Sequence, residues 1–250
     1  MAVSKNIYFA SDFHLGAPSF QESLAREKKI VAWLNDIFES TQELFLMGDL
    51  FDFWFEYKHV APKGYIRFLG KLCEFTDAGI PVHVFTGNHD MWMFDYLEKE
   101  IGVTIHRDNI VREFGNKKFF LGHGDGLGPG DHGYKFIKKI FANKVCQWLF
   151  ARLHPNFAFG MANFWSKQSR KSGAEADKVF LGEENEWLAI YCKEQLQKIH
   201  YDYFIFGHRH LPIDIKLPQN ARYVNLGEWI NYYTYAVFNG EKLLLKSIKD

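Results

Sequence analysis

Five short polar motifs, each placed directly after a run of apolar residues, constrain this 250-residue chain more than any other feature. In four of them a glycine is followed at once by a side chain that can bind a metal ion. Glycine permits the tight turns that a backbone needs where it passes close to an ion or a substrate. The motifs are Asp12-Phe13-His14, Gly48-Asp49-Leu50-Phe51-Asp52, Gly87-Asn88-His89-Asp90, Gly122-His123-Gly124-Asp125 and Gly207-His208-Arg209-His210.

The apolar runs before the motifs are short and continuous, which is typical of buried strands. We expect these strands at Ile7–Ser11, Leu44–Met47, Val82–Thr86, Phe119–Leu121 and Tyr203–Phe206. Helical spacing of apolar residues predicts helices over 22–40 and 64–78. The segment from 222 to 248 is predicted to form further strands. Strands separated by helices indicate βαβ units with largely parallel pairing, hence an α/β fold. Ligands of such sheets bind beyond the carboxyl ends of the strands, where all five motifs lie.

The residue types in the motifs suit a pair of divalent ions. Two such ions about 3.5–4 Å apart need a bridging anion, for which Asp49 is the natural candidate, and Asp12 supplies a second carboxylate. On extended backbone, residues i and i+2 share one face, so Asp-x-His and His-x-His would each present two ligands together. Asn88 offers a neutral oxygen, which leaves net positive charge to attract a phosphate. Mixed imidazole and carboxylate ligands suit Mn, Fe or Zn rather than Ca.

Each motif alone also has an ordinary explanation. A Gly-Asp after a strand is usually a turn, and Asn-His-Asp can begin a helix with Asn88 as its cap. The occurrence of all five in one chain, each after a predicted strand, favours the metal site. A non-catalytic scaffold would be expected to have lost some of these ligands, and none is missing.

The order DxH, GDxxD, GNHD, GHGD and GHxH resembles the calcineurin-like metallophosphoesterases over almost the whole chain. The resemblance implies a four-layer α/β/β/α sandwich with two central mixed sheets, and one domain over 1–250 with a helical cap insert at about 130–185. It also implies two metal sites that share one aspartate. The first is made by Asp12, His14, Asp49 and His210, and the second by Asp49, Asn88, His123 and His208.

In the implied reaction the two ions activate a water molecule and neutralise charge on the phosphoryl oxygens. His89 is then not a ligand but contacts the phosphate or protonates the leaving oxygen. Asp52 would orient His89 and stabilise its charged form, and the alternative for Asp52 is a surface turn residue. The resemblance gives Mn as the usual metal, and Fe, Zn or Mg use similar ligands.

Residues 132–174 differ from the rest because they hold many lysines, arginines and aromatic residues but no Asp or Glu. Their apolar positions follow helical spacing in the first half, which predicts a basic, aromatic-rich helical insert. Its apolar side chains could line an acyl pocket while its cations meet anionic phospholipid headgroups. The alternative is an ordinary amphipathic helical hairpin with a solvated basic face.

Longer segments, among them GDLFDFWFEY, GNHDMW, HGDGLGPGDHGYKF and FGHRHLP, are similar to the UDP-2,3-diacylglucosamine pyrophosphatase family of lipid A biosynthesis. The implied reaction hydrolyses UDP-2,3-diacylglucosamine to UMP and 2,3-diacylglucosamine 1-phosphate (lipid X) at the inner face of the cytoplasmic membrane. Two residues depart from the best-known members, which have Arg and Glu in place of His89 and Asp52. Arg170 and Gly173 also replace other residues of that family. The implied substrate contacts are Asn88, His89, Asp131, Ser166, Arg170, Lys171 and His208.

The two departures at His89 and Asp52 match the wider phosphoesterases, so a second hypothesis is a soluble metallophosphoesterase acting on nucleotides or phosphoproteins. A net charge of zero and an apolar insert disfavour a nuclease or general nucleic-acid binder. Three scattered cysteines without a CxxC pair indicate reduced thiols in the cytosol. No apolar run is long enough for a signal peptide or a membrane-spanning helix, so we expect a cytoplasmic protein bound peripherally to the membrane.

Overall fold

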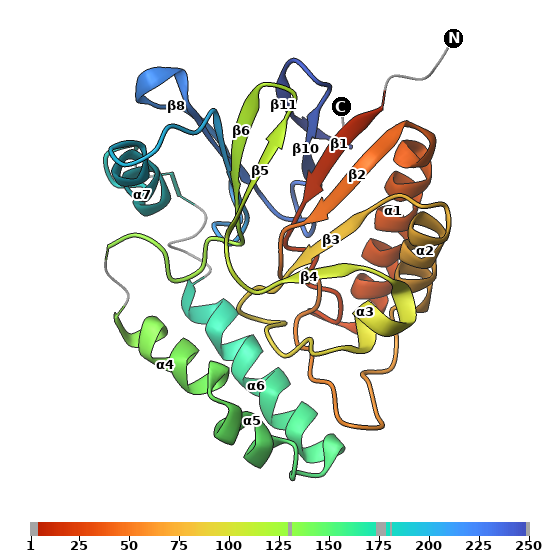
Figure 1. The fold of residues 1–250 in the computed structure, drawn as a ribbon. Coiled ribbons are helices and arrows are strands. Elements are labelled where there is room, and N and C mark those ends of the chain that lie inside the picture. The colour runs from red at the N-terminus through yellow and green to blue at the C-terminus, as the bar shows by residue number, and fades with distance from the viewer. Residues whose placement is uncertain (1–4, 130–131, 174–178, 181, 249–250) are drawn as a thin grey trace.

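The computed structural model describes residues 5–129, 132–173, 179–180 and 182–248. Within these ranges two β-sheets stack face to face, and helices cover their outer faces (Figure 1). The first sheet has the strand order β11-β10-β1-β2-β3-β4, and the second has the order β5-β6-β7-β9-β8. This arrangement confirms the predicted four-layer α/β/β/α sandwich.

The first sheet consists of β1 (Asn6–Ala10), β2 (Thr41–Leu46), β3 (Val82–Phe85), β4 (Thr104–His106), β10 (Thr234–Phe238) and β11 (Leu243–Ser247). The second consists of β5 (Ile110–Phe114), β6 (Lys117–Leu121), β7 (Tyr203–Phe206), β8 (Pro212–Lys216) and β9 (Arg222–Leu226). The helices are α1 (Phe20–Ile37), α2 (Ile66–Asp77), α3 (Tyr96–Ile101), α4 (His132–Ala142), α5 (Lys144–Phe150), α6 (Pro155–Gly173) and α7 (Trp187–Leu196). Single 3-10 turns lie at Phe38–Ser40 and Pro218–Asn220.

The predicted strands and helices are all present, with ends that shift by a few residues. Pairing is parallel from β1 through β2 and β3 to β4, and from β6 through β7 to β9. It is antiparallel where β10 joins β1, β11 joins β10, β5 joins β6 and β8 joins β9. The sheets are therefore mixed, as the family resemblance implied, rather than largely parallel, as the βαβ pattern indicated.

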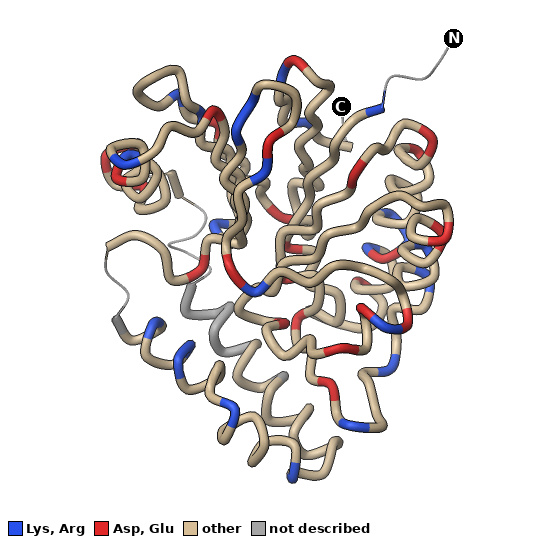
Figure 2. Tube along the Cα trace, viewed as in Figure 1, with Lys and Arg blue, Asp and Glu red and all other residues tan. Residues whose placement is uncertain are grey.

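Helices α4, α5 and α6, which we call the cap, project from beside the sheets and lie within the range predicted for the helical insert (Figure 1). Figure 2 shows lysine and arginine along α4 and α5 and no acidic residue between them. The cap contacts the loops after β2 and β3: the rings of Phe53 and Phe159 are 5.0 Å apart, and Trp92 Nε1 donates to Phe141 O at 2.8 Å. None of the helices in the described part of the chain combines the length and apolar character that spanning a membrane requires.

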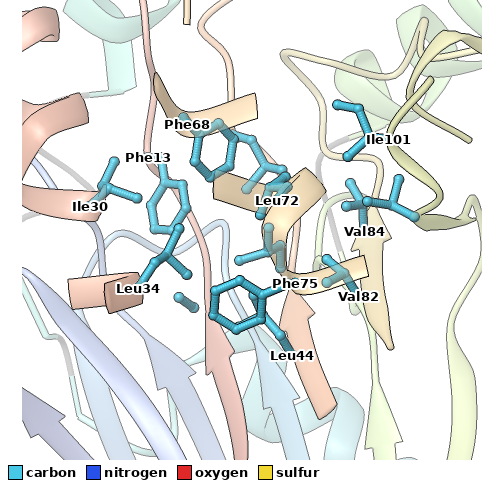
Figure 3. Close-up of a cluster of buried hydrophobic side chains, with 14 of the residues drawn as sticks. Phe13, Ile30, Leu34, Leu44, Phe68, Leu72, Phe75, Val82, Val84 and Ile101 are labelled. Atoms are coloured by element: carbon cyan, nitrogen blue, oxygen red, sulfur yellow. The ribbon is translucent and has the colours of Figure 1, made fainter. Parts of the chain in front are cut away.

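The hydrophobic core of the described residues consists of three clusters, each of which lies between two neighbouring layers. One apolar cluster joins α1 and α2 to the first sheet, where Phe68, Leu72 and Phe75 of α2 lie against Leu44 and Val82 (Figure 3). A second cluster fills the space between the sheets, and a third joins α7 to the second sheet. Full burial of a Leu or Phe side chain contributes about 1.5–3 kcal/mol. Packing on both faces therefore fixes each sheet, and with it the loops at its strand ends.

Candidate metal centre

The five motifs converge, because β1, β2, β3, β6 and β7 all end at the same side of the sandwich. Asp12, His14, Asp49 and His210 present ligand atoms within 4.8 Å of one another, and so do Asp49, His123 and His208. Asn88 Oδ1 lies 3.3 Å from His123 Nε2. The structure thus brings together all seven side chains that the sequence indicated as ligands, in two groups that share Asp49.

The two aspartates at the centre each use one carboxylate oxygen for hydrogen bonds. Asp12 Oδ2 accepts from Ser11 Oγ at 2.5 Å and from His208 N at 3.1 Å. Asp49 Oδ1 accepts from His89 N at 2.8 Å. The other oxygens, Asp12 Oδ1 and Asp49 Oδ2, are buried and accept no hydrogen bond within the described part of the chain. A buried anionic oxygen that accepts no hydrogen bond is costly, so this donor set fits a bound cation.

The histidines also suit metal binding. Burial lowers the pKa of His14 and that of His208 to about 4, so both imidazoles are neutral at pH 7, which is the form that binds a metal. Burial opposes charge on His123 as well, but the negative charge of Asp49 outweighs it and raises the pKa of His123 to about 10. The carboxylates therefore attract positive charge, which a divalent ion would supply in place of that proton.

His123 is held in the tautomer that a ligand needs. Its Nδ1 lies 2.8 Å from Met47 O, to which it donates a hydrogen bond. Its Nε2 then points toward Asp49 Oδ2, at 3.4 Å. A hydrogen bond from the far ring nitrogen to a carbonyl is the usual way in which a protein orients a histidine ligand.

The backbone of the ligand loops is not extended, contrary to the expectation for Asp-x-His and His-x-His. The φ angles are 55° at Asp12, 43° at His14, 53° at Asp49, 66° at His208 and 55° at His210. The left-handed region costs a non-glycine residue about 1–2 kcal/mol. The paired ligands thus share a face because each loop turns sharply, and strain of this kind gathers at functional sites.

Asp90, to which the sequence assigned no function of its own, connects two of the loops. Its buried carboxylate accepts hydrogen bonds from the backbone N–H of Gly87, Asp49, Leu50 and Phe51, at 2.8, 3.3, 2.7 and 3.3 Å. Burial and the nearby Asp49 charge raise the pKa of Asp90 to about 7, against the effect of these donors. The place of Asp90 at the end of the GNHD motif was the only sequence signal for a function. Which backbone amides its carboxylate meets is shown by the fold alone.

Arg26 positions the first loop, and no sequence pattern indicated it. This buried residue of α1 donates from Nε to Phe13 O at 2.6 Å and from Nη2 to His14 O at 2.6 Å and Ala17 O at 2.5 Å. Its position within a helix rich in charged residues gave no sign of burial. The contacts fix the backbone that carries His14.

His89 and Asp52 lie beside the metal ligands and meet a residue of the cap. His89 Nδ1 is 3.0 Å from the carbonyl oxygen of Asp52. Ser166 Oγ donates to Asp52 Oδ2 at 3.0 Å and lies 3.1 Å from His89 Nδ1. Asp52 is buried, so the surface-turn alternative is wrong. The Ser166 hydroxyl therefore joins the Asp52 carboxylate to His89.

The structure describes only some of the other predicted substrate contacts. Asp131 lies outside the described residues. Arg170 and Lys171 belong to α6, but their side chains are outside the described part of the structure. Asn88, His89, Ser166 and His208 all lie at the metal centre or its border.

A cavity of about 470 Å³ opens beside the metal centre, under the cap. Asn88, His89, Asp52 and Ser166 form its polar border. The rest of its lining is mostly apolar and comes from the cap and the loops it covers: Phe53, Met91, Trp92, Tyr134, Ile137, Lys138, Ile140, Phe141, Phe150, Ala162 and Trp165. The site therefore joins a set of metal ligands to an apolar space.

The chain is similar to several known proteins. The calcineurin-like phosphoesterase family matches residues 5–212. The UDP-2,3-diacylglucosamine hydrolase of Porphyromonas gingivalis is 39% identical, with 98% of each chain covered. The enzyme of the same name from Aeromonas hydrophila is 27% identical over 88% of this chain and 89% of the relative. Among solved structures, vacuolar protein sorting 29 from Cryptosporidium parvum has a TM-score of 0.46 at 12% identity, covering 96% of this chain and 89% of that one.

The family match spans all five motifs up to His210, and the ligand geometry fits the divalent ions that this family of hydrolases uses. The chain belongs to the calcineurin-like phosphoesterase family.

Proposed function

We propose that this chain hydrolyses the diphosphate of UDP-2,3-diacylglucosamine to UMP and 2,3-diacylglucosamine 1-phosphate (lipid X). One water molecule is added as one P–O bond of the diphosphate breaks, so each product leaves with a phosphate. The observation that carries the proposal is the apolar cavity that opens directly beside the metal ligands. The names of relatives at 39% and 27% identity point to the same substrate.

We propose two divalent ions, Mn²⁺ by preference, held by Asp12, His14, Asp49 and His210 and by Asp49, Asn88, His123 and His208. When bound, such ions activate water and offset phosphoryl charge. The protein orients their ligands through Arg26, Asp90 and the carbonyl of Met47.

His89 is proposed to contact the phosphate or protonate the leaving oxygen, because its ring lies at the border between metal ligands and cavity. Its Nδ1 is held by the Asp52 carbonyl and by Ser166, which leaves Nε2 free of these two contacts. Positioning of this kind limits the ring to one orientation before substrate arrives.

The acyl chains are proposed to occupy the apolar cavity, and the cap to meet the inner surface of the cytoplasmic membrane. Several large apolar side chains of the cap are exposed: Phe136, Ile137, Ile140, Val145, Trp148, Leu149, Phe157, Phe164 and Trp165. Basic residues accompany them without acidic ones, which suits an anionic lipid surface (Figure 2). A soluble phosphomonoesterase would need neither feature, so the observations disfavour that alternative.

The test compares purified UDP-2,3-diacylglucosamine with a soluble diphosphate that lacks acyl chains, UDP-N-acetylglucosamine, in the presence of Mn²⁺, following UMP release. We expect the acylated substrate to have the higher kcat/KM by several orders of magnitude. Ala162→Phe, which fills the cavity from α6, should lower kcat/KM for the acylated substrate. Asn156→Phe adds a bulkier side chain at an exposed position of the same helix and should leave it unchanged. Equal activity on both substrates would refute the lipid substrate.

Membrane association is measured separately, by sedimentation with vesicles of phosphatidylethanolamine and phosphatidylglycerol. Binding should fall when Trp148 and Phe164 are both replaced by serine, because both side chains are exposed on the cap. Vesicles of neutral phosphatidylcholine should bind less protein than anionic ones. Equal recovery of the protein with and without vesicles would contradict a peripheral membrane location.

A further inference from the structure

A second cavity, of about 510 Å³, reaches the same metal centre from the side of His123. It lies between α4 of the cap, the end of β3 and the turn from β4 to β5. Its lining includes Thr86, Arg107, Asn109, Lys135 and Lys139. The first cavity is mainly apolar, so the two spaces at this site differ in chemistry.

Positive charge exceeds negative charge around this second cavity. Its acidic side chains are Asp108 and Asp125. Asp125 is already paired with Lys138, whose Nζ lies 2.6 Å from Asp125 Oδ2. Besides this pair, the described residues of the lining include three cations, Arg107, Lys135 and Lys139, and one carboxylate, that of Asp108. An anion entering this space therefore meets an excess of cations in addition to any bound metal.

The two cavities meet at the metal ligands. Asn88 lines the first and His123 lines the second, and Asn88 Oδ1 lies 3.3 Å from His123 Nε2. Lys138 lines both cavities. A substrate with its phosphoester bond at the metal centre would consequently have one part in each cavity.

We propose that the second cavity binds the nucleoside monophosphate half of the substrate, so that the diphosphate is cleaved between an apolar and a polar compartment. This inference rests on the proposed function. Lys135 and Lys139 offer cations to the phosphate nearest the nucleoside. The Asn109 amide has both a donor and an acceptor, which match the imide edge of uracil. The acyl sugar phosphate then lies on the cap side, against the apolar walls of the first cavity.

The experiment titrates UMP into the Mn²⁺-loaded protein and measures the heat of binding, with inorganic phosphate as the second probe. Lys139→Glu should weaken UMP binding roughly tenfold, because a charge reversal near the phosphate replaces attraction by repulsion. Lys144→Glu, an exposed position at the start of α5 that lines neither cavity, should change UMP affinity by less than about twofold. Asn109→Ala should weaken UMP while leaving phosphate binding unaltered.

Two results would overturn the inference. One is a UMP affinity that neither Lys139→Glu nor Asn109→Ala changes. The other is an equal loss of UMP and phosphate binding in both variants, which would assign the effect to the metal centre alone. Because binding is measured without turnover, this test is separate from the proposed reaction. If the chain binds UMP through Lys139 and Asn109 but does not cleave UDP-2,3-diacylglucosamine, the proposed substrate is refuted. Nucleotide binding in the second cavity is then still supported.

Discussion

Ser166 Oγ lies 3.1 Å from His89 Nδ1, which joins the cap to the edge of the metal centre. The same hydroxyl donates to Asp52 Oδ2 at 3.0 Å. Ser166 is buried, although it belongs to a cap with many exposed residues. The cap therefore does more than cover an apolar cavity, because one of its side chains contacts a residue proposed to act on the phosphate.

Replacing Ser166 by alanine should lower kcat about tenfold, because it removes a hydrogen bond of roughly 1–1.5 kcal/mol, one of the two contacts that hold His89 Nδ1. KM should change little if the hydroxyl positions His89, and should rise if it binds substrate directly, as the family resemblance implies. Steady-state kinetics on UDP-2,3-diacylglucosamine separate the two outcomes. Ser166→Thr retains the hydroxyl and should recover much of the activity. An alanine variant with unaltered kcat and KM would exclude both functions.

Replacing His89 by alanine should reduce kcat by roughly 10²–10⁴-fold while both ions stay bound, since a general acid contributes rate in this range. Metal content is measured by elemental analysis after gel filtration, beside the activity. Asp49→Asn is the comparison, because it removes the carboxylate shared by both ligand groups. That variant should lose both turnover and bound metal. Loss of one metal equivalent from His89→Ala would show that His89 is a ligand instead.

The strand–motif pattern predicted an α/β fold with the candidate ligands gathered at the strand ends, while the four layers and the mixed pairing were implied by the family resemblance. A short apolar run before Asp12 or Asn88 is typical of a buried strand, and parallel strands end at one edge. Strands without such a run were missed, among them β4 (Thr104–His106) and β8 (Pro212–Lys216). Residues of mixed polarity in these short segments take their conformation from the sheets they join.

The positioning of the ligands depends on contacts between segments far apart in the chain, and those contacts have no local signal. Asp90 meets Leu50 across 40 residues, and Ser166 meets Asp52 across 114. The positive φ angles of Asp12 and Asp49 likewise arise because tertiary contacts outweigh local preference. Residue type and order therefore predict which side chains gather at the candidate metal centre, while the fold determines how they are held.

Replacing Gly87 by alanine should weaken Mn²⁺ binding and lower the melting temperature. A Cβ at this position would overlap Asp49 Oδ1 and lie 2.6 Å from Asp49 N, and backbone cannot move aside cheaply. Gly70→Ala is the matched control, because a Cβ there meets nothing within 4 Å in α2. It should stabilise the protein by about 0.5–1 kcal/mol. Metal affinity unchanged by Gly87→Ala would show that the two loops are less tightly packed than their contacts indicate.

His106, which lies outside the metal centre, should make the free energy of unfolding depend on pH. Its Nε2 lies 3.0 Å from His83 Nδ1, and burial, followed by the charges of His83 and Arg112, lowers the pKa of His106 to about 4, with Glu98 acting against this shift. The unfolded chain takes up this proton below about pH 6.5, but the folded protein does not until about pH 4. The contribution of His106 to stability is therefore complete above pH 6.5 and is lost progressively as the pH falls to 4.

Urea unfolding of the wild type and His106→Asn, at pH values from 7.5 to 4.5 and a fixed Mn²⁺ concentration, measures this contribution. Asparagine cannot take up the proton, so the variant should lose less free energy of unfolding on acidification than the wild type. The comparison of slopes cancels the histidines at the metal centre, because both proteins contain them. Parallel slopes would mean that solvent reaches the half-buried His106 ring and restores the ordinary pKa of the imidazole.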